Sequence, residues 1–153
     1  MYDTIAFLRG GTGLPAADEL GQETRPFELV VPYTNAAVAA QALARAVELA
    51  HGFEAAVTLM AVHVLPYPSP LESQEGIRKR LEAELTAVAR TSPVSIRVKL
   101  VFARDREDAY LGLLPRQSLV VIGTKDRWWR TREERLARRL TARGYSVAVV
   151  KAR

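Results

Sequence analysis

The sequence predicts an α/β fold in which a doubly wound, five-stranded parallel sheet carries helices on both faces. Three observations lead to this prediction. Short apolar runs alternate with longer segments of helical periodicity along residues 27–151, which is typical of repeated β-α-β units. Residues 119–122 are uniformly apolar, as expected for a central strand that is buried on both faces. Residues 96–102 instead alternate apolar side chains with Arg97 and Lys99, which predicts an edge strand with one solvated face.

Numbered along the chain, the five predicted strands fit the order 3-2-1-4-5 with right-handed crossovers. The switch point of this order lies between predicted strands 1 and 4. Ligands of open α/β sheets bind beside the switch point, at the carboxyl ends of the strands. The apolar run of predicted strand 4 stops at Gly123, so any site is expected just past this glycine.

The first strand and helix are predicted from a proline and a capping residue. Residues 28–32 form the strand, and Pro32 lies at its end because proline cannot donate to a strand ladder. Either Thr34 or Asn35 then supplies the N-cap oxygen of an alanine-rich helix that runs to about residue 50.

The next elements alternate in the same way. Residues 54–65 are predicted as the second strand, and the three prolines within residues 66–70 exclude a helix there. Residues 71–91 have the spacing of an amphipathic helix, and residues 94–103 form the third strand.

The last part of the chain completes the sheet. Asp105 is expected to cap a short third helix. The fourth strand is followed by an arginine-rich helix over residues 131–143, Gly144 ends that helix, and residues 145–151 form the fifth strand.

Residues 1–26 are predicted to be an N-terminal arm or extension of a single α/β domain that spans residues 27–153. Residues 5–8 fit a short strand or a turn of helix. The glycines that follow are expected to end this element and form a flexible loop. No Gly-Lys-Ser/Thr follows these glycines, so they are not a phosphate loop. We expect the arm to pack on a neighbouring subunit, and the alternative is that it covers the edge of strand 5.

Composition excludes several classes of protein. The chain of 153 residues contains no cysteine, which excludes disulfides, thiolate metal sites and a cysteine nucleophile. Its apolar runs fall far short of the ~20 residues of a membrane-spanning helix. The N-terminus has no basic segment ahead of a long apolar core, so no signal peptide is predicted. We therefore expect a soluble cytoplasmic protein without a membrane partner.

The net charge of +5 is unevenly distributed. Residues 125–153 carry a charge of +7, whereas the remaining residues sum to −2. Such a face can attract nucleic acid, but a solvated helix face is the simpler interpretation. We therefore do not expect nucleic acid as a partner.

Four short motifs together resemble the universal stress protein family over residues 27–151. They are the Val-Pro at 31–32 before an alanine-rich helix, the Ala-Val-His-Val at 61–64, the Val-Val-Ile-Gly at 120–123 and the terminal Val-Ala-Val-Val at 147–150. The resemblance implies the same 3-2-1-4-5 sheet, with the layering of flavodoxin-like and adenine nucleotide alpha hydrolase-like folds. It also implies a cytoplasmic location and frequent homodimers, in a family whose members divide into nucleotide-binding and non-binding groups.

The sequence departs from the family's ATP-binding pattern. Binding members carry an acidic residue shortly after the first Val-Pro, where this chain has Thr34, and a G-x2-G-x9-G-[ST] loop after the fourth strand. Gly123 matches the first glycine of that loop, but the second falls on Asp126 and the final Gly-Ser/Thr falls near residues 136–137. Those glycines let backbone N–H groups approach a polyphosphate. The resemblance therefore implies a member of the family that does not bind ATP, and no cofactor is expected.

The alternative is an adenine nucleotide or another phosphorylated ligand at the ends of predicted strands 1 and 4. The candidate ligand-binding residues are Pro32, Tyr33, Thr34, Gly123, Thr124, Lys125, Arg127 and Arg130. The three cations of this set would replace the missing backbone contacts. Trp128 and Trp129 are expected to pack over the sheet, and the alternative is that they stack on a ring of the ligand.

No other pattern predicts catalysis or a metal. His51 and His63 have no partners at metal-ligand spacing, and His63 is expected to be a hydrogen-bonded core residue. Asp105, Glu107 and Asp108 fit helix capping. Since no nucleophile, base and orienting group occur together, the sequence predicts no catalytic residues and a protein that is not an enzyme.

The fifth strand predicts a homodimer. Its centre carries no charge or proline, so its open edge can pair with a second copy through Val147, Val149 and Val150. The function expected from the sequence is therefore a dimeric, non-enzymatic module that acts in a stress response through its own subunits or an unknown protein partner. The alternative function is a sensor of a nucleotide or phosphorylated ligand.

Overall fold

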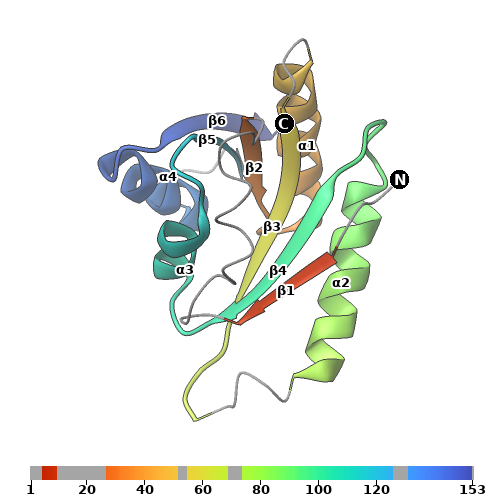
Figure 1. Ribbon diagram of the computed structural model, residues 1–153, viewed down its shortest axis with the longest axis vertical. Helices are drawn as coiled ribbons and strands as arrows, with labels where there is room; N and C mark the ends of the chain where they lie inside the picture. Colours follow the sequence, from red (N-terminus) through yellow and green to blue (C-terminus); the bar gives the residue numbers. More distant parts are fainter. Residues whose placement is uncertain (1–4, 10–26, 52–54, 69–73, 126–130, 153) are drawn as a thin grey trace, which may run out of the picture.

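The computed structural model describes residues 5–9, 27–51, 55–68, 74–125 and 131–152. These residues form one parallel sheet of six strands in the order β1-β4-β3-β2-β5-β6 (Figure 1). The strands are β1 (Ile5–Arg9), β2 (Glu28–Pro32), β3 (Ala56–Val64), β4 (Arg97–Ala103), β5 (Ser118–Lys125) and β6 (Ser146–Ala152).

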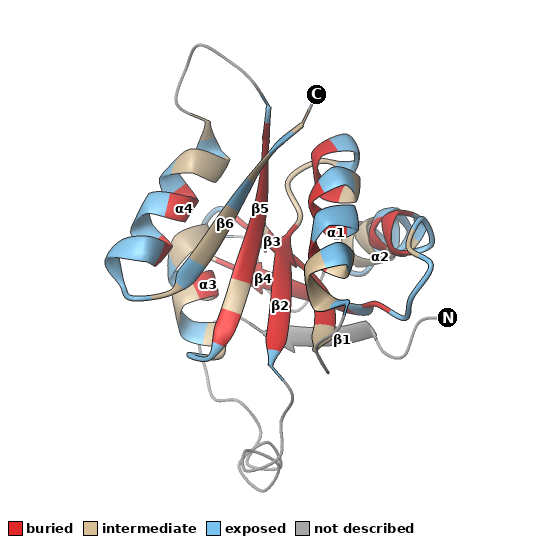
Figure 2. Ribbon diagram, turned by 90° about the horizontal axis from the view of Figure 1, so that it is seen from above, coloured by how far each residue is buried: buried red, intermediate tan, exposed pale blue. Residues whose placement is uncertain are grey.

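Within the described residues, four helices cover the two faces of the sheet, two on each side (Figure 1, Figure 2). On one face lie α1 (Ala36–Ala50) and α2 (Glu75–Ala89), and on the other lie α3 (Arg106–Leu113) and α4 (Arg132–Ala142). The five strands from β2 to β6 correspond to the five predicted strands. Their order β4-β3-β2-β5-β6 is the predicted 3-2-1-4-5, so the predicted fold class is confirmed.

The prediction that the third strand lies at an edge is wrong. This strand is β4, and its outer side pairs in parallel with β1, with Phe7 beside Leu100. The alternation that motivated the prediction does describe the two faces, since Arg97 is exposed and Lys99 is half-buried. Alternation reports which face meets water, and it does not report whether another strand binds the edge.

The expected end of the fourth strand also needs correction. The apolar run stops at Gly123, but β5 continues to Lys125 and stays paired with β6, where Lys125 lies beside Ala152. Burial also continues past the apolar run, since Thr124 is buried. Backbone pairing with β6 extends the strand two residues further.

Each face of the sheet has its own hydrophobic core. On the face covered by α1 and α2, the core contains Val31 of β2, Leu59 of β3 and Leu100 of β4. These strand residues pack against Leu43 of α1 and Leu85 of α2. The other face has an equivalent core. There the strand residues Val30, Met60, Val101 and Ile122 pack against Tyr110 of α3 and against Leu136 and Leu140 of α4. The central strands are consequently buried along most of their length (Figure 2).

Side chains at the helix ends explain where the helices begin. Asn35, and not Thr34, caps α1, since its Oδ1 accepts the N–H of Val38 at 3.0 Å. Thr131 caps α4 by accepting the N–H of Glu134 at 3.2 Å. Gly144 ends α4 with a φ of 88°, a left-handed conformation that favours glycine, as predicted.

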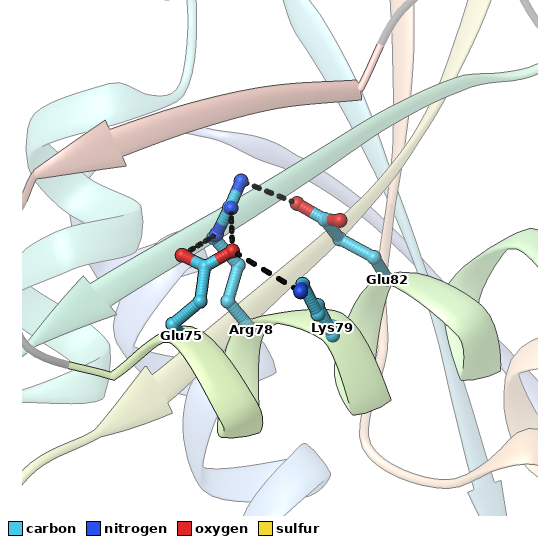
Figure 3. A network of polar contacts seen from close by, with 4 residues as sticks. All are labelled: Glu75, Arg78, Lys79 and Glu82. Atoms are coloured by element: carbon cyan, nitrogen blue, oxygen red, sulfur yellow. Dashed lines mark hydrogen bonds and ion pairs between the residues drawn. The ribbon is translucent and has the colours of Figure 1, made fainter.

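The exposed side of α2 is held by ion pairs within the helix (Figure 3). Arg78 donates to Glu75 and, at 3.3 Å, to Glu82 one turn further on. Lys79 lies 4.0 Å from Glu75. The cations of this surface are therefore matched by acids of the same helix.

Candidate functional site

The switch point of the sheet lies between β2 and β5, as the sequence predicts. Hydrogen-bonded pairing between these strands covers residues 28–30 and 118–120. Beyond them β2 continues beside β3 to Pro32, whereas β5 continues beside β6. Those predicted ligand residues that the structure describes therefore lie at the ends of two strands that are no longer paired with each other.

Gly123 faces helix α1. A Cβ atom at this position would lie 2.5 Å from Cγ1 of Val38, 2.6 Å from its carbonyl oxygen and 3.2 Å from Cβ of Ala42. Both distances to Val38 are far inside van der Waals contact. The glycine therefore allows α1 to pack directly on β5, which explains its presence without a ligand.

The β2 side of the predicted site is made of Pro32, Tyr33 and Thr34. Pro32 is buried as the last residue of β2, and the other two are half-buried in the turn before α1. The Tyr33 N–H donates to the carbonyl of Met60 at 2.8 Å, and its hydroxyl donates to Glu84 of α2 at 3.4 Å. Burial, and then the charge and hydrogen bond of Glu84, raise the pKa of Tyr33. Tyr33 thus joins the β2 end to α2.

The β5 side of the predicted site is only partly described. Thr124 is buried at 2% exposure, and Lys125 is exposed at the end of β5. Arg127 and Arg130, together with Asp126 and the two tryptophans, lie outside the described residues.

The two histidines lie on different elements, His51 after α1 and His63 in β3. His51 follows α1 and is exposed. His63 is half-buried rather than fully buried, and its ring meets Phe102 edge to face with centroids 5.6 Å apart. Burial lowers the pKa of His63, and the charges of Arg80 and Arg106 add to this effect. His63 therefore tends toward the neutral form.

A second feature of the carboxyl edge was missed by the sequence reasoning. A cavity of about 420 Å³ opens where β3 and β4 end and α3 and α4 begin. We call it the basic cleft; it is lined by Val64, Arg104, Asp105, Arg106, Glu107, Arg132, Arg135 and Leu136. Four of these eight residues are arginines.

The acids near the basic cleft already have partners. Asp105 caps α3 by accepting the N–H of Asp108 at 2.9 Å, which confirms its predicted role. Glu107 accepts a hydrogen bond from Arg139 of α4, and Arg139 also lies 3.4 Å from Asp108. These contacts join α3 to α4. They also compensate the charges of Glu107 and Asp108 with a cation that is not part of the cleft lining.

Two signals in the sequence could have indicated the cleft. Arg104 and Arg106 follow directly after a buried strand, and Arg132 and Arg135 lie in the first turn of the basic helix. Each pair alone is typical of a solvated helix start. Only the fold shows that both pairs meet at one place.

The edge of β6 is the third notable surface. β6 lies at the end of the sheet opposite β1, so residues 5–9 do not cover it. Val149 is 51% exposed, and Val147 and Val150 are half-buried. The three predicted interface residues thus share one accessible strand.

The described residues show no group of three His, Asp or Glu side chains that could hold a metal ion. In the same part of the chain, no helix combines the length and the apolar character that a transmembrane segment needs.

An all-parallel sheet of this order, with two helices on each face in the described part of the chain, defines a doubly wound α/β domain. No family model matches the chain, and no curated protein is similar to it in sequence. Its structure is similar to a universal stress protein from Archaeoglobus fulgidus, with a TM-score of 0.59, 14% identity and coverage of 86% of this chain and 98% of that one.

Two further universal stress proteins support the same fold. UspA from Lactobacillus plantarum has a TM-score of 0.54 at 20% identity, over 85% of this chain and 99% of its own. A universal stress protein in complex with cAMP has a TM-score of 0.54 at 15% identity, over 85% and 100%. The chain therefore has the universal stress protein fold.

Proposed function

We propose that this chain is a non-enzymatic, dimeric universal stress protein-like module of the cytoplasm. It acts in a stress response by binding a second copy of itself or a protein partner, and it does not use ATP. The observation that carries the proposal is the open apolar edge of β6, at the end of the sheet that β1 does not cover.

The two edges of the sheet differ. β4 is shielded by β1, whereas the outer side of β6 has no strand beside it in the described part of the chain. An exposed strand edge with few charges is a template for another strand. Two β6 strands in antiparallel pairing would satisfy both edges around a two-fold axis and leave no open edge for further growth. Val149 is the most exposed apolar side chain of this strand.

The absence of ATP binding is supported by the environment of Gly123. This glycine is the only one that matches the family's phosphate loop, and the contact with Val38 accounts for it. The loop's other glycines are replaced by larger residues, which cannot bring their N–H groups as close to a polyphosphate.

A second candidate function is a sensor of an adenine nucleotide or another phosphorylated ligand at the switch point. The complex of a protein of this fold with cAMP favours it. The residues would be Pro32, Tyr33, Thr34, Gly123, Thr124, Lys125, Arg127 and Arg130. Calorimetric titration with ATP and with cAMP tests this candidate. Tight binding that is lost in Lys125→Ala would support the sensor and contradict the proposal of a module without ATP.

Substitution of Val149 tests the dimer. Val149→Lys places a charge on the open edge, so it should convert a dimer into a monomer in sedimentation velocity while the circular dichroism spectrum stays unchanged. Val94→Lys is the matched control, because Val94 is also an exposed valine, at 42%, but lies outside β6. A wild type that sediments as a monomer at micromolar concentration would rule out the dimer.

A further inference from the structure

We propose that the basic cleft is a binding site for a phosphorylated small molecule that carries at least two negative charges. The described lining of the cleft comes from the ends of β3 and β4 and the starts of α3 and α4, and it reaches Leu136, where the family's phosphate loop would end. None of the described candidate residues of the switch point lines it. It is also independent of the dimer, since none of its lining residues belongs to β6.

Arg104 is fixed at the wall of the cleft. Its Nη1 donates to the carbonyl oxygens of Leu65 at 3.1 Å and of Pro66 at 2.9 Å. Its guanidinium also lies over the ring of Tyr67, with 4.1 Å from Cζ to the ring centroid. This positive charge is therefore held in place before any ligand arrives, which lowers the entropy cost of binding.

Three more guanidinium groups lie around the same cavity without a carboxylate partner among the described residues. They belong to Arg106 in the first turn of α3 and to Arg132 and Arg135 in the first turn of α4. The helix α2 shows the contrast, because its Arg78 and Lys79 pair with acids of their own helix (Figure 3). Arginines that line one cavity and have no ion-pair partner among the described residues favour an anion between them.

The balance of charge indicates the charge of the ligand. Among the described residues, four arginines and two acids line the cleft, and one of these acids, Glu107, is paired with Arg139 outside the lining. Asp105 is engaged by the backbone of α3. The described lining thus keeps an excess of at least two positive charges, which suits a phosphate monoester or a pyrophosphate group.

The walls of the cleft also suit a small organic molecule. Val64 is 38% exposed and lines the cavity together with Leu136, so an apolar part of the ligand has a surface to contact. The volume of about 420 Å³ lies within the usual range of small-molecule sites. Phosphate oxygens on the arginines and carbon atoms on Val64 would place a sugar phosphate across the cleft.

Calorimetric titration of the full chain with pyrophosphate and with ribose 5-phosphate, at about 0.15 M salt, tests the site. The cleft variant is Arg132→Gln with Arg135→Gln. The control is Arg138→Gln with Arg143→Gln, which removes the same charge from exposed positions of the same helix region outside the cleft. We expect about tenfold weaker binding or more in the cleft variant, since hydrogen bonds to charged groups are strong, and less than about twofold in the control. Thermal unfolding of both variants checks that they are folded.

Each other outcome contradicts the proposal. Equal losses in both double variants would mean that only the total charge matters. No binding of either small phosphate by the wild type would remove the site. Binding of a short single-stranded RNA without binding of the small phosphates would assign the arginines to nucleic acid. Loss of binding in Lys125→Gln with an unaffected cleft variant would place the ligand at the switch point instead.

Discussion

Substitution of Gly123 by alanine tests the packing on which the switch point is built. The added Cβ would lie 2.5 Å from Cγ1 of Val38 and 2.6 Å from the Val38 carbonyl oxygen. Carbon atoms in favourable contact are about 3.5–4.0 Å apart. A new rotamer of Val38 relieves only the first contact, because the carbonyl belongs to the backbone of α1. The helix must therefore move away from β5 by about 1 Å.

The expected loss of stability follows from two opposing terms. Overpacking of a close-packed core costs about 1–3 kcal/mol. The cost should lie in the upper part of this range, because the Val38 carbonyl oxygen cannot move away without the backbone of α1. Alanine also reduces the entropy of the unfolded chain, which returns about 0.4–1 kcal/mol. We expect Gly123→Ala to lower the free energy of unfolding by about 2 kcal/mol, which corresponds to a fall in Tm of about 4–8 °C.

Equilibrium unfolding in urea measures this change, with Gly76→Ala as the control. A Cβ at Gly76 of α2 meets nothing within 4 Å, so alanine there should be neutral or stabilise by up to about 1 kcal/mol. Val38→Ala combined with Gly123→Ala should recover part of the loss, since it removes one of the two close contacts.

A loss below about 0.5 kcal/mol in Gly123→Ala would refute this reasoning. It would mean that α1 does not lie directly on β5. The packing explanation of Gly123 would then fail, and with it one of the supports for a module without ATP.

Four further substitutions test polar side-chain contacts. The pKa of the Tyr110 hydroxyl is raised by burial, so the folded state keeps the proton that the unfolded state releases above about pH 10. Above about pH 10, the free energy of unfolding of the wild type should fall with pH more steeply than that of Tyr110→Phe, by up to about 1.4 kcal/mol per pH unit. Parallel pH profiles of the two proteins would contradict this prediction. Below pH 9, loss of the 3.1 Å bond to the Met60 carbonyl should cost Tyr110→Phe about 1 kcal/mol in urea unfolding. Thr58→Val removes the 2.7 Å bond to buried Glu28 and should cost about 1–3 kcal/mol, more than Glu28→Gln, which keeps an acceptor. The reverse order would contradict a stabilising role for this bond. Asn35→Ala should cost about 1 kcal/mol through the lost cap of α1, and an unchanged urea midpoint would show that the cap is dispensable.

The sequence predicted the elements of the domain well because their signals are local. The alternation of short apolar runs with amphipathic segments is set by contacts within a few residues, and it gave the five strands from β2 to β6 in the right order. Capping by Asp105 and the end of α4 at Gly144 depend only on neighbouring backbone groups, so they were also predicted. The choice between Thr34 and Asn35 as the cap of α1 needed the structure.

The edges of the sheet were decided by tertiary structure. The edge interpretation of residues 96–102 was wrong because a strand pairs through its backbone, and side-chain alternation carries no information about that pairing. The short apolar segment Ile5–Arg9 fits several environments, and only the assembled sheet places it beside β4. The same assembly leaves β6 as the edge without a strand beside it in the described part of the chain.

By itself, the sequence determined the fold class, the place of the switch point and the missing glycines of the ATP pattern, because all three can be read from residues close together in the chain. Only the tertiary structure decided that Gly123 faces α1 and that the arginines after β4 share a cleft with those at the start of α4. These groups are separated along the chain by α3 and β5. They meet because parallel strands with crossovers of one hand bring their carboxyl ends to the same edge of the sheet, whatever their distance in sequence.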